Sequence, residues 1–287
     1  MNVLKIADIR FGFVSQMPIE CQNEMHLFEQ PSDAPCDYIF QVVAGELPPI
    51  PSYSPLYANT KLAVYQEPTA ERAYYCLPNH PWNFCLEKAD GAETLYVIAE
   101  NADYVQNIWN VFDKIEFSSR LLAHGAVMLH SSYLIYRDRA ILFTGPSGMG
   151  KSTQAELWRK TLGAEVINGD RSIIREKEGR LWTFGTPYAG TSGICQNRSA
   201  PLQAIVTLQQ GPENTIRPLT RRECTRFFLA QTTIQRWKAE DVIGTMELWD
   251  SFITKVPVLQ LTCRPDEDAV YTLQAYLDAL DAKENHL

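Results

Sequence analysis

The sequence predicts an α/β protein in which a mostly β N-terminal lobe precedes a mixed, partly antiparallel core with a phosphate-binding loop. Residues 145–152 read Gly-Pro-Ser-Gly-Met-Gly-Lys-Ser, between an apolar run at 140–144 and a helix-forming stretch at 153–158. Short apolar runs alternate with turn residues from 1 to about 104. The apolar runs 133–136 and 140–144 are separated by only three residues, too few for a helical crossover, which predicts an antiparallel pair.

Short strands are expected throughout the first 104 residues. Apolar runs lie at 9–14, 38–43, 62–65 and 95–98, and turn-forming clusters such as Pro48-Pro49-Ile50-Pro51 separate them. We therefore assign residues 1–104 to a β-rich lobe, with substrate or partner binding as its candidate role. Residues 105–287 are assigned to the P-loop core.

The core is expected to contain further helices and strands. Apolar residues at helical spacing predict a helix over about 105–124 that packs against the core sheet. Strands are expected at 127–130, 133–136, 140–144, 165–168, 172–175, 181–184, 204–209 and 258–263. Helices are expected near 220–237, 240–255 and 265–282, the last opened by Pro265 and Asp266.

Composition indicates a packed globular protein, with 45% hydrophobic and 21% charged residues. The net charge of −8 and the lack of a long basic run argue against a nucleic-acid partner. The seven cysteines show no C-x-x-C spacing, and no apolar stretch reaches membrane-spanning length. With no basic start followed by an apolar segment at the N-terminus, we expect a cytoplasmic protein with free thiols and no membrane partner. The sequence leaves open whether the protein forms a homo-oligomer.

The 145–152 segment is a complete phosphate-binding (Walker A) loop. Its glycines let backbone N–H groups turn toward phosphate oxygens, with the positive end of a helix dipole behind them. Lys151 is expected to reach the β- and γ-phosphates, and the Ser152 hydroxyl to ligate Mg²⁺. The expected nucleotide-binding residues of the loop are Gly145, Ser147, Gly148, Met149, Gly150, Lys151, Ser152 and Thr153.

Phosphoryl transfer needs further groups beyond the loop. Asp170, at the end of an apolar run in Asn168-Gly169-Asp170-Arg171, is the candidate Mg²⁺ ligand, with a turn aspartate as the alternative. His130 is expected beside the loop, where it would contact the γ-phosphate, help to ligate a second metal or handle a proton; a structural histidine is the alternative. Arg198 is the candidate charge-neutralising, nucleotide-binding cation, against a surface salt bridge.

A second glycine-containing segment, 186–193, reads Thr-Pro-Tyr-Ala-Gly-Thr-Ser-Gly. Its small and hydroxyl-bearing residues follow a predicted strand. Two interpretations stay open: a backbone that approaches the ligand closely, or an ordinary surface turn.

These residues resemble the HPr kinase/phosphorylase family and its relatives in the phosphoenolpyruvate carboxykinase-like superfamily. The resemblance covers roughly 120–270 and is carried by Leu129-His130, the segment 140–153 and Asn168-Gly169-Asp170-Arg171. Segments 185–193 and 256–266 are similar to those of uncharacterised bacterial members.

The resemblance implies an ATP-dependent phosphotransferase with a mixed sheet. Lys151 and Ser152 would serve phosphate and Mg²⁺, Asp170 would ligate the metal, and His130 would lie near phosphate or metal. The family usually shows two adjacent aspartates where this chain has Gly169-Asp170, and the first is generally credited as the base. The group that activates the acceptor is therefore unassigned.

The expected function is transfer of the γ-phosphoryl group of ATP to a hydroxyl, either of a serine in a peptide or protein or of a small metabolite. Asp170 or His130 would assist the acceptor. The alternative is a catalytically weak ATP-binding sensor whose N-terminal lobe recruits a peptide. Carboxykinase chemistry is disfavoured because the sequence has no clear arginine and lysine set for oxaloacetate.

Overall fold

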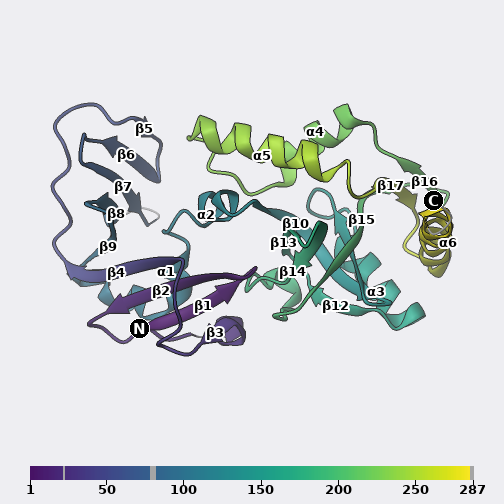
Figure 1. Ribbon diagram of the computed structural model, residues 1–287, viewed down its shortest axis with the longest axis horizontal. Helices are drawn as coiled ribbons and strands as arrows, with labels where there is room; N and C mark the ends of the chain where they lie inside the picture. The colour runs from purple at the N-terminus through teal and green to yellow at the C-terminus, as the bar shows by residue number, and fades with distance from the viewer. Residues whose placement is uncertain (22, 78–81, 285–287) are drawn as a thin grey trace. The chain divides into compact units, whose positions relative to one another are not determined.

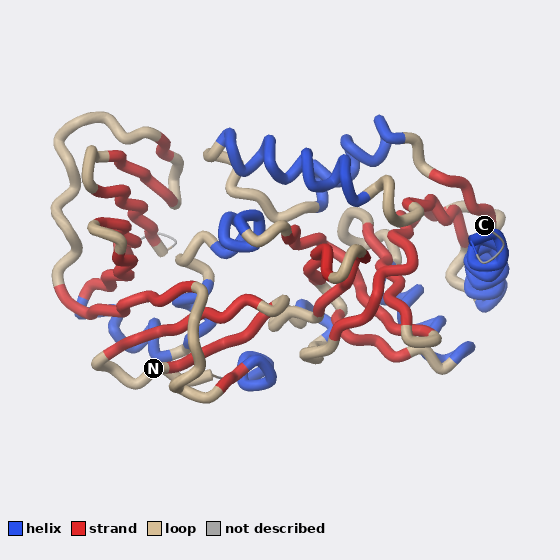
Figure 2. The backbone as a smooth tube through the Cα atoms, viewed as in Figure 1, coloured by secondary structure: helices blue, strands red, loops and turns tan. Residues whose placement is uncertain are grey.

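The computed structural model of the protein describes residues 1–21, 23–77 and 82–284 (Figure 1). The chain divides into two compact units, Met1–Phe117 and Ser118–Leu287. This division lies later in the chain than the boundary between residues 104 and 105 that the sequence suggested. The first unit is rich in strands, whereas the second combines strands with most of the long helices (Figure 2).

The later division follows from a break in the helix predicted over 105–124. That segment forms two short helices, α1 (Ile108–Phe112) and α2 (Phe117–Ala123), after the 3₁₀ helix η2 (Ala99–Gln106). Glu116 between them has a φ of 52°, a left-handed conformation that ends helical geometry. Phe112 packs against Phe11 and Phe13 of the first unit. The first half of the apolar stripe therefore belongs to the N-terminal unit, and its prediction as core-sheet packing was wrong.

The first unit is built on one nine-stranded sheet with the order β3-β1-β2-β4-β9-β8-β7-β6-β5. β4 lies parallel to both β2 and β9, while the other pairs are antiparallel. The strands are β1 (Asn2–Ile6), β2 (Ile9–Ser15), β3 (Glu29–Gln30), β4 (Tyr38–Gly45), β5 (Tyr57–Ala58), β6 (Leu62–Gln66), β7 (Ala70–Cys76), β8 (Trp82–Ala89) and β9 (Ala92–Ile98), with the 3₁₀ helix η1 (Asn23–Phe28) before β3. The strands expected from the sequence are present.

The second unit contains eight paired strands and is mixed, as expected. They are β10 (Ala126–Tyr136), β11 (Arg139–Thr144), β12 (Glu165–Asn168), β13 (Arg171–Lys177), β14 (Arg180–Phe184), β15 (Ser199–Gln210), β16 (Thr215–Pro218) and β17 (Val258–Cys263). β11, β15 and β17 are parallel neighbours, whereas the other pairs are antiparallel.

Two long strands, β10 and β15, each change partners along their length. The first half of β10 pairs with β13 and its second half with β11 and β12. The start of β15 pairs with β14, and its remainder pairs with β11 and β17. The strands β11, β10, β13, β14 and β15 therefore form a closed circuit of pairings. The antiparallel pairing of 133–136 with 140–144 is confirmed, but 127–130 and 133–136 are one strand, not two.

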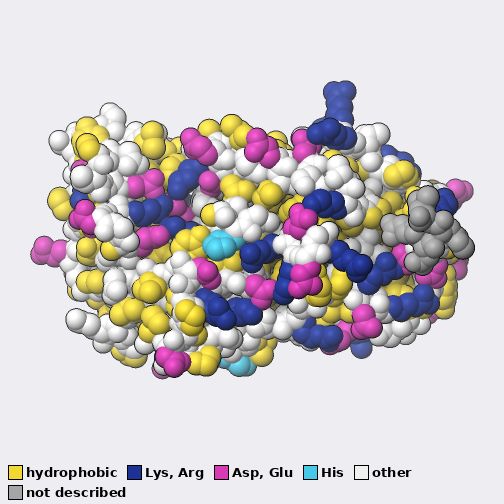
Figure 3. All heavy atoms as spheres, in the orientation of Figure 1, with side chains coloured by type: hydrophobic (Ala, Val, Ile, Leu, Met, Phe, Trp, Pro, Cys, Tyr) yellow, Lys and Arg dark blue, Asp and Glu magenta, His cyan; other side chains and the backbone are white. Residues whose placement is uncertain are grey.

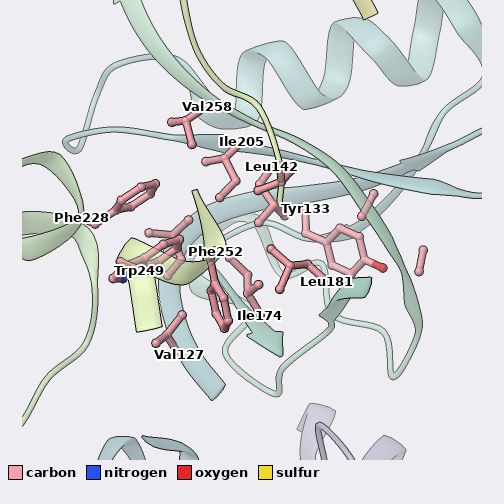
Figure 4. Close-up of a cluster of buried hydrophobic side chains, with 14 of the residues drawn as sticks. Val127, Tyr133, Leu142, Ile174, Leu181, Ile205, Phe228, Trp249, Phe252 and Val258 are labelled. Atoms are coloured by element: carbon pink, nitrogen blue, oxygen red, sulfur yellow. The ribbon is translucent and has the colours of Figure 1, made fainter. Parts of the chain in front are cut away.

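Both faces of the central strand β11 are buried, which explains its uninterrupted apolar sequence. Ile141 and Phe143 pack with Trp158 of α3 (Lys151–Leu162) and Leu273 of α6 (Glu267–Glu284). Leu142 lies in the cluster on the other face, with Phe228 of α4 (Arg221–Gln231) and Trp249 of α5 (Ala239–Phe252) (Figure 4).

The helix predicted over 220–237 ends six residues early, at Gln231. A capping box between Thr220 and Glu223 begins it, as the sequence allows. At its end, Thr232 forms a bridge with Leu129, and the Thr233 N–H donates to the Met128 carbonyl. Residues 232 and 233 therefore bond to β10 and do not continue the helix. Strand β16, which no apolar run predicts, is added at the edge beside β17.

Within the described part of the chain, every helix is too short or too polar to cross a membrane. The face in Figure 3 carries acidic and basic side chains in mixture rather than in one large basic patch.

Candidate phosphate-binding site

The predicted phosphate loop, residues 145–152, connects β11 to α3 within the second unit, in the strand–loop–helix order that the sequence predicts. Gly148 and Gly150 have φ angles of 80° and 98°, which side-chain-bearing residues rarely adopt. A Cβ atom at either position would meet no neighbouring atom of the described residues within 4 Å. These glycines therefore serve the turn of the backbone, and the space beside them is open.

Helix α3 begins at Lys151, within the last residues of the loop segment, with Gly150 as its N-cap. The first N–H groups of an α-helix have no partner within the helix, and they mark its positive end. Ser152 and Thr153, in this first turn, are exposed. This helix start therefore offers N–H donors and hydroxyl groups to an anion.

The Lys151 ammonium group is held inside the turn of the loop. Its Nζ donates to the carbonyl oxygens of Gly145 at 2.9 Å and Pro146 at 3.2 Å, and the residue is 8% exposed. Burial lowers the pKa of Lys151 below its ordinary value of 10.5, while the charge of Asp170 acts in the opposite direction. A buried ammonium group whose partners are neutral carbonyls is well suited to gain an anionic ligand.

A cavity of about 410 Å³ joins the loop to residues from distant parts of the sequence. Its lining includes Ser147, Gly148, Gly150, Lys151, Ser152 and Thr153 from the loop and α3, together with His130, Gly169, Asp170, Gly190 and Thr191. This volume is in the usual range for small-molecule sites. Of the described residues that line it, Asp170 alone is acidic.

His130 reaches the cavity because β10 and β11 pair. The Thr144 hydroxyl donates to the His130 carbonyl at 2.7 Å, and the Ser131 N–H donates to the Asp170 carbonyl at 2.9 Å. These bonds fix the middle of β10 against both the strand before the loop and the turn at 168–170. His130 Nε2 lies 3.4 Å from Asp170 Oδ1. The structure thus places His130 and Asp170 beside each other and in the same cavity as the loop, where the sequence analysis expected them.

Neighbouring groups lower the pKa of the Asp170 carboxyl group and favour its ionised form. The hydrogen bond from His130 lowers the pKa of Asp170 below its ordinary value of 3.8, and the nearby Arg171 charge acts in the same direction against the effect of burial. Arg171 Nε lies 3.2 Å from Asp170 Oδ2. The carboxylate is therefore ionised at neutral pH, which suits a metal ligand better than a proton acceptor.

Asn168 shapes the turn that presents Asp170, a role that the sequence analysis missed. Its buried Oδ1 accepts from the N–H groups of Asp170 and Arg171, both at 2.9 Å, and its Nδ2 donates to the Thr186 carbonyl at 2.8 Å. The Asn-Gly-Asp sequence is a turn signal from which this arrangement was predictable.

The segment 186–193 borders the same cavity through Gly190 and Thr191, so the surface-turn interpretation is insufficient. Gly190 is left-handed, with a φ of 57°, and a Cβ atom there would lie 2.7 Å from Asp170 Cβ. A Cβ atom at Gly169 would overlap the Ser192 side chain. Ser192 therefore occupies the space into which an aspartate at 169 would project.

Three predicted nucleotide-binding residues do not line this cavity. Gly145 accepts from Lys151, and Met149 borders a neighbouring cavity. Arg198 is half-exposed and pairs with Glu165, so its position fits the surface-salt-bridge alternative. Arg171 is the cation beside Asp170: it donates to the Thr233 hydroxyl at 3.0 Å and lies over the Tyr188 ring. The sequence offered Arg171 only as the neighbour of Asp170.

No metal-ligating cluster of three or more His, Cys, Asp or Glu residues is found in the stretches 1–21, 23–77 and 82–284. A magnesium ion bound with a nucleotide does not need one, because it is usually held by one or two carboxylates together with phosphates and water. Ser152, at the start of α3, and Asp170, in the turn at 168–170, line the same cavity and fit this requirement.

No family model matches the chain, and no curated protein matches it. Among solved structures, the HPr(Ser) kinase/phosphatase from Coxiella burnetii is similar to 55% of this chain and 97% of its own, at 12% sequence identity and a TM-score of 0.31. A similarity of this size carries no weight for the activity of the chain.

Proposed function

We propose that the protein is an ATP-dependent kinase that transfers the γ-phosphoryl group to a hydroxyl of a serine-containing peptide or protein, or of a small metabolite. The observation that carries the proposal is the cavity shared by the phosphate loop, His130 and Asp170. Loop N–H groups and the Lys151 ammonium group would hold the β- and γ-phosphates. Their positive charge would stabilise the negative charge of the transferring group.

Magnesium would be held by the Ser152 hydroxyl and the Asp170 carboxylate, and it would neutralise phosphate charge when bound. In the transfer, the bond between the γ-phosphorus and the oxygen bridging to the β-phosphate breaks, and a bond to the acceptor oxygen forms. The acceptor proton leaves to His130 or to water, and ADP is the other product. His130 is preferred over Asp170 for the proton because the low pKa of Asp170 makes it a weak base.

Single-turnover transfer from γ-labelled ATP tests the proposal, with serine peptides, free serine and polyols as acceptors. We expect labelled product from at least one class. Asp170→Asn should lower the rate by on the order of 10²-fold, since it weakens the hold on the magnesium ion that would neutralise phosphate charge. Asp278→Asn is the matched control, because this exposed carboxylate pairs with Arg137 away from the cavity. An equal rate in the Asp170→Asn variant would contradict the assignment.

A catalytically weak ATP sensor is the second candidate, and the turn at 168–170 favours it. Ser192 fills the space beside Gly169, so the described residues give the cavity one carboxylate and no second one to serve as base. A sensor would bind ATP tightly and transfer no label to any acceptor. The same experiment therefore separates the two functions.

A further inference from the structure

A second cavity, of about 390 Å³, borders the phosphate loop and shares Gly148, Gly150 and Thr153 with the first. Much of the rest of its wall is formed by Met149, Gln154, Gln210 and the segment Cys263–Pro265. The two cavities therefore meet at the loop. A molecule with a phosphate tail in the first cavity would have its remaining part near the second.

The position of this cavity follows from the strand order. β11, β15 and β17 are adjacent and parallel, so their carboxyl ends lie at one edge of the sheet. The phosphate loop follows β11, Gly211 follows β15, and Arg264 follows β17. Ligands of open α/β sheets bind outside the carboxyl ends of the strands. The second cavity is thus where the rest of a nucleotide is expected.

The lining suits a flat aromatic ring with polar edges. Met149, Cys263 and Pro265 supply apolar surface, and two glutamines supply amide groups. None of the described residues in the wall is acidic. Two nitrogens of Arg264 are engaged: Nε donates to Asp266 at 2.7 Å and one terminal nitrogen donates to the Pro212 carbonyl at 3.2 Å.

Gln154 is the residue in this wall with an unsatisfied group. It is 2% exposed, and its Oε1 has no hydrogen-bond partner in the described chain. Its Nε2 donates only to the Cys263 sulfur, a weak acceptor, at 3.3 Å. Buried carbonyl oxygens normally have a donor. The terminal torsion of glutamine is soft, so the amide can turn toward the cavity at the loss of one weak bond.

We infer that this cavity is a base subsite for adenine, and that the Gln154 amide recognises the edge of the ring that carries the amino group. A glutamine amide pairs with adenine by accepting from the amino group and donating to a ring nitrogen. On the N6/N7 edge that this pairing uses, guanine presents two acceptors, O6 and N7, and would leave the Gln154 oxygen without a donor. The inference rests on the proposed nucleotide function.

The test compares the affinities of tripolyphosphate, ATP, GTP and purine riboside triphosphate, which lacks only the amino group of ATP. We expect ATP to bind about tenfold more tightly than the other two nucleotides, because only its amino group would supply a donor to the buried Gln154 oxygen, which has none in the described chain without it. Gln154→Leu should lower the affinity for ATP to the affinity for purine riboside triphosphate and leave the affinity for tripolyphosphate unchanged. Gln209→Leu, at an exposed glutamine that does not line the cavity, is the control.

The outcomes separate this inference from the proposed function. Binding of tripolyphosphate with no gain from adenine, or with GTP equal to ATP, would overturn the base subsite and leave the phosphate site standing. Failure of every ligand, tripolyphosphate included, would overturn both. Since the first comparison needs only the unaltered protein, it holds even if the Gln154 variant does not fold.

Discussion

Glycines on the two sides of the phosphate cavity differ in what surrounds them. At Gly148 and Gly150 in the phosphate loop, a Cβ atom would meet nothing within 4 Å in the part of the chain that the structure describes. At Gly169 it would overlap Ser192, and at Gly190 it would lie 2.7 Å from Asp170 Cβ. The loop side is open, whereas the side formed by 168–170 and 186–193 is filled by the protein itself.

This difference separates two requirements for glycine. On the open side, glycine provides a left-handed backbone and leaves room for a ligand. On the filled side, glycine allows two segments to approach closely enough to fix Asp170. Changes on the open side are therefore expected to affect ligand binding first, and changes on the filled side to affect stability and the position of Asp170.

The largest expected effect is on the open side, from Lys151→Ala. At ATP a hundredfold above its dissociation constant, nucleotide binding should stabilise the protein by about 2.7 kcal/mol. The variant should lose most of this stabilisation, measured as the ATP-dependent shift in thermal unfolding, because it lacks the ammonium group that is proposed to bind the phosphates. Lys160→Ala, on the same helix at an exposed position, should keep the shift. An unchanged shift in Lys151→Ala would show that the loop does not hold the nucleotide.

The open side was predictable from the sequence because its requirements are local. A strand, a glycine loop and a helix follow one another along the chain, so residue order alone indicates the N–H donors, Lys151 and Ser152. The antiparallel return of β10 was predictable for the same reason, since the turn at 137–139 is short. His130 reached the cavity through that pairing.

The filled side was less predictable because it depends on contacts between distant segments. Ser192 meets Gly169, and Asn168 bonds to Thr186, through folding that no local pattern specifies. Arg198 was proposed as a site cation from residue type alone, and its pairing with Glu165 depends on the same long-range packing. The break at Glu116 was hidden by an apolar stripe that continues through it.

The next effect is on the filled side. Gly169→Ala should lower the free energy of unfolding by about 1–3 kcal/mol, because the new methyl group overlaps Ser192. Ser192→Gly, which removes that side chain, should recover part of the loss when the two changes are combined, and a double-mutant cycle in urea measures this coupling. Gly148→Ala is the comparison on the open side, where backbone strain costs about 1 kcal/mol with no overlap and no coupling to Ser192. Additive effects of Gly169→Ala and Ser192→Gly would remove the distinction between the two sides.

The smallest expected effect is a pH dependence of ATP affinity that arises from Lys151 on the open side and not from Asp170 on the filled side. Asp170 has a pKa below 3.8, so it stays ionised throughout the neutral and alkaline range. Lys151 has a pKa lowered from 10.5, mainly by burial, so it loses its charge at a lower pH than an ordinary lysine. Bound ATP would stabilise the charged form of Lys151, and the affinity for ATP should therefore fall as pH rises through the lowered pKa, before 10.5 is reached. Lys151→Arg, whose guanidinium group stays charged, should bind ATP with a flat profile over the same range. A profile for Lys151→Arg that falls in parallel with that of the unaltered protein would assign the pH dependence to another group.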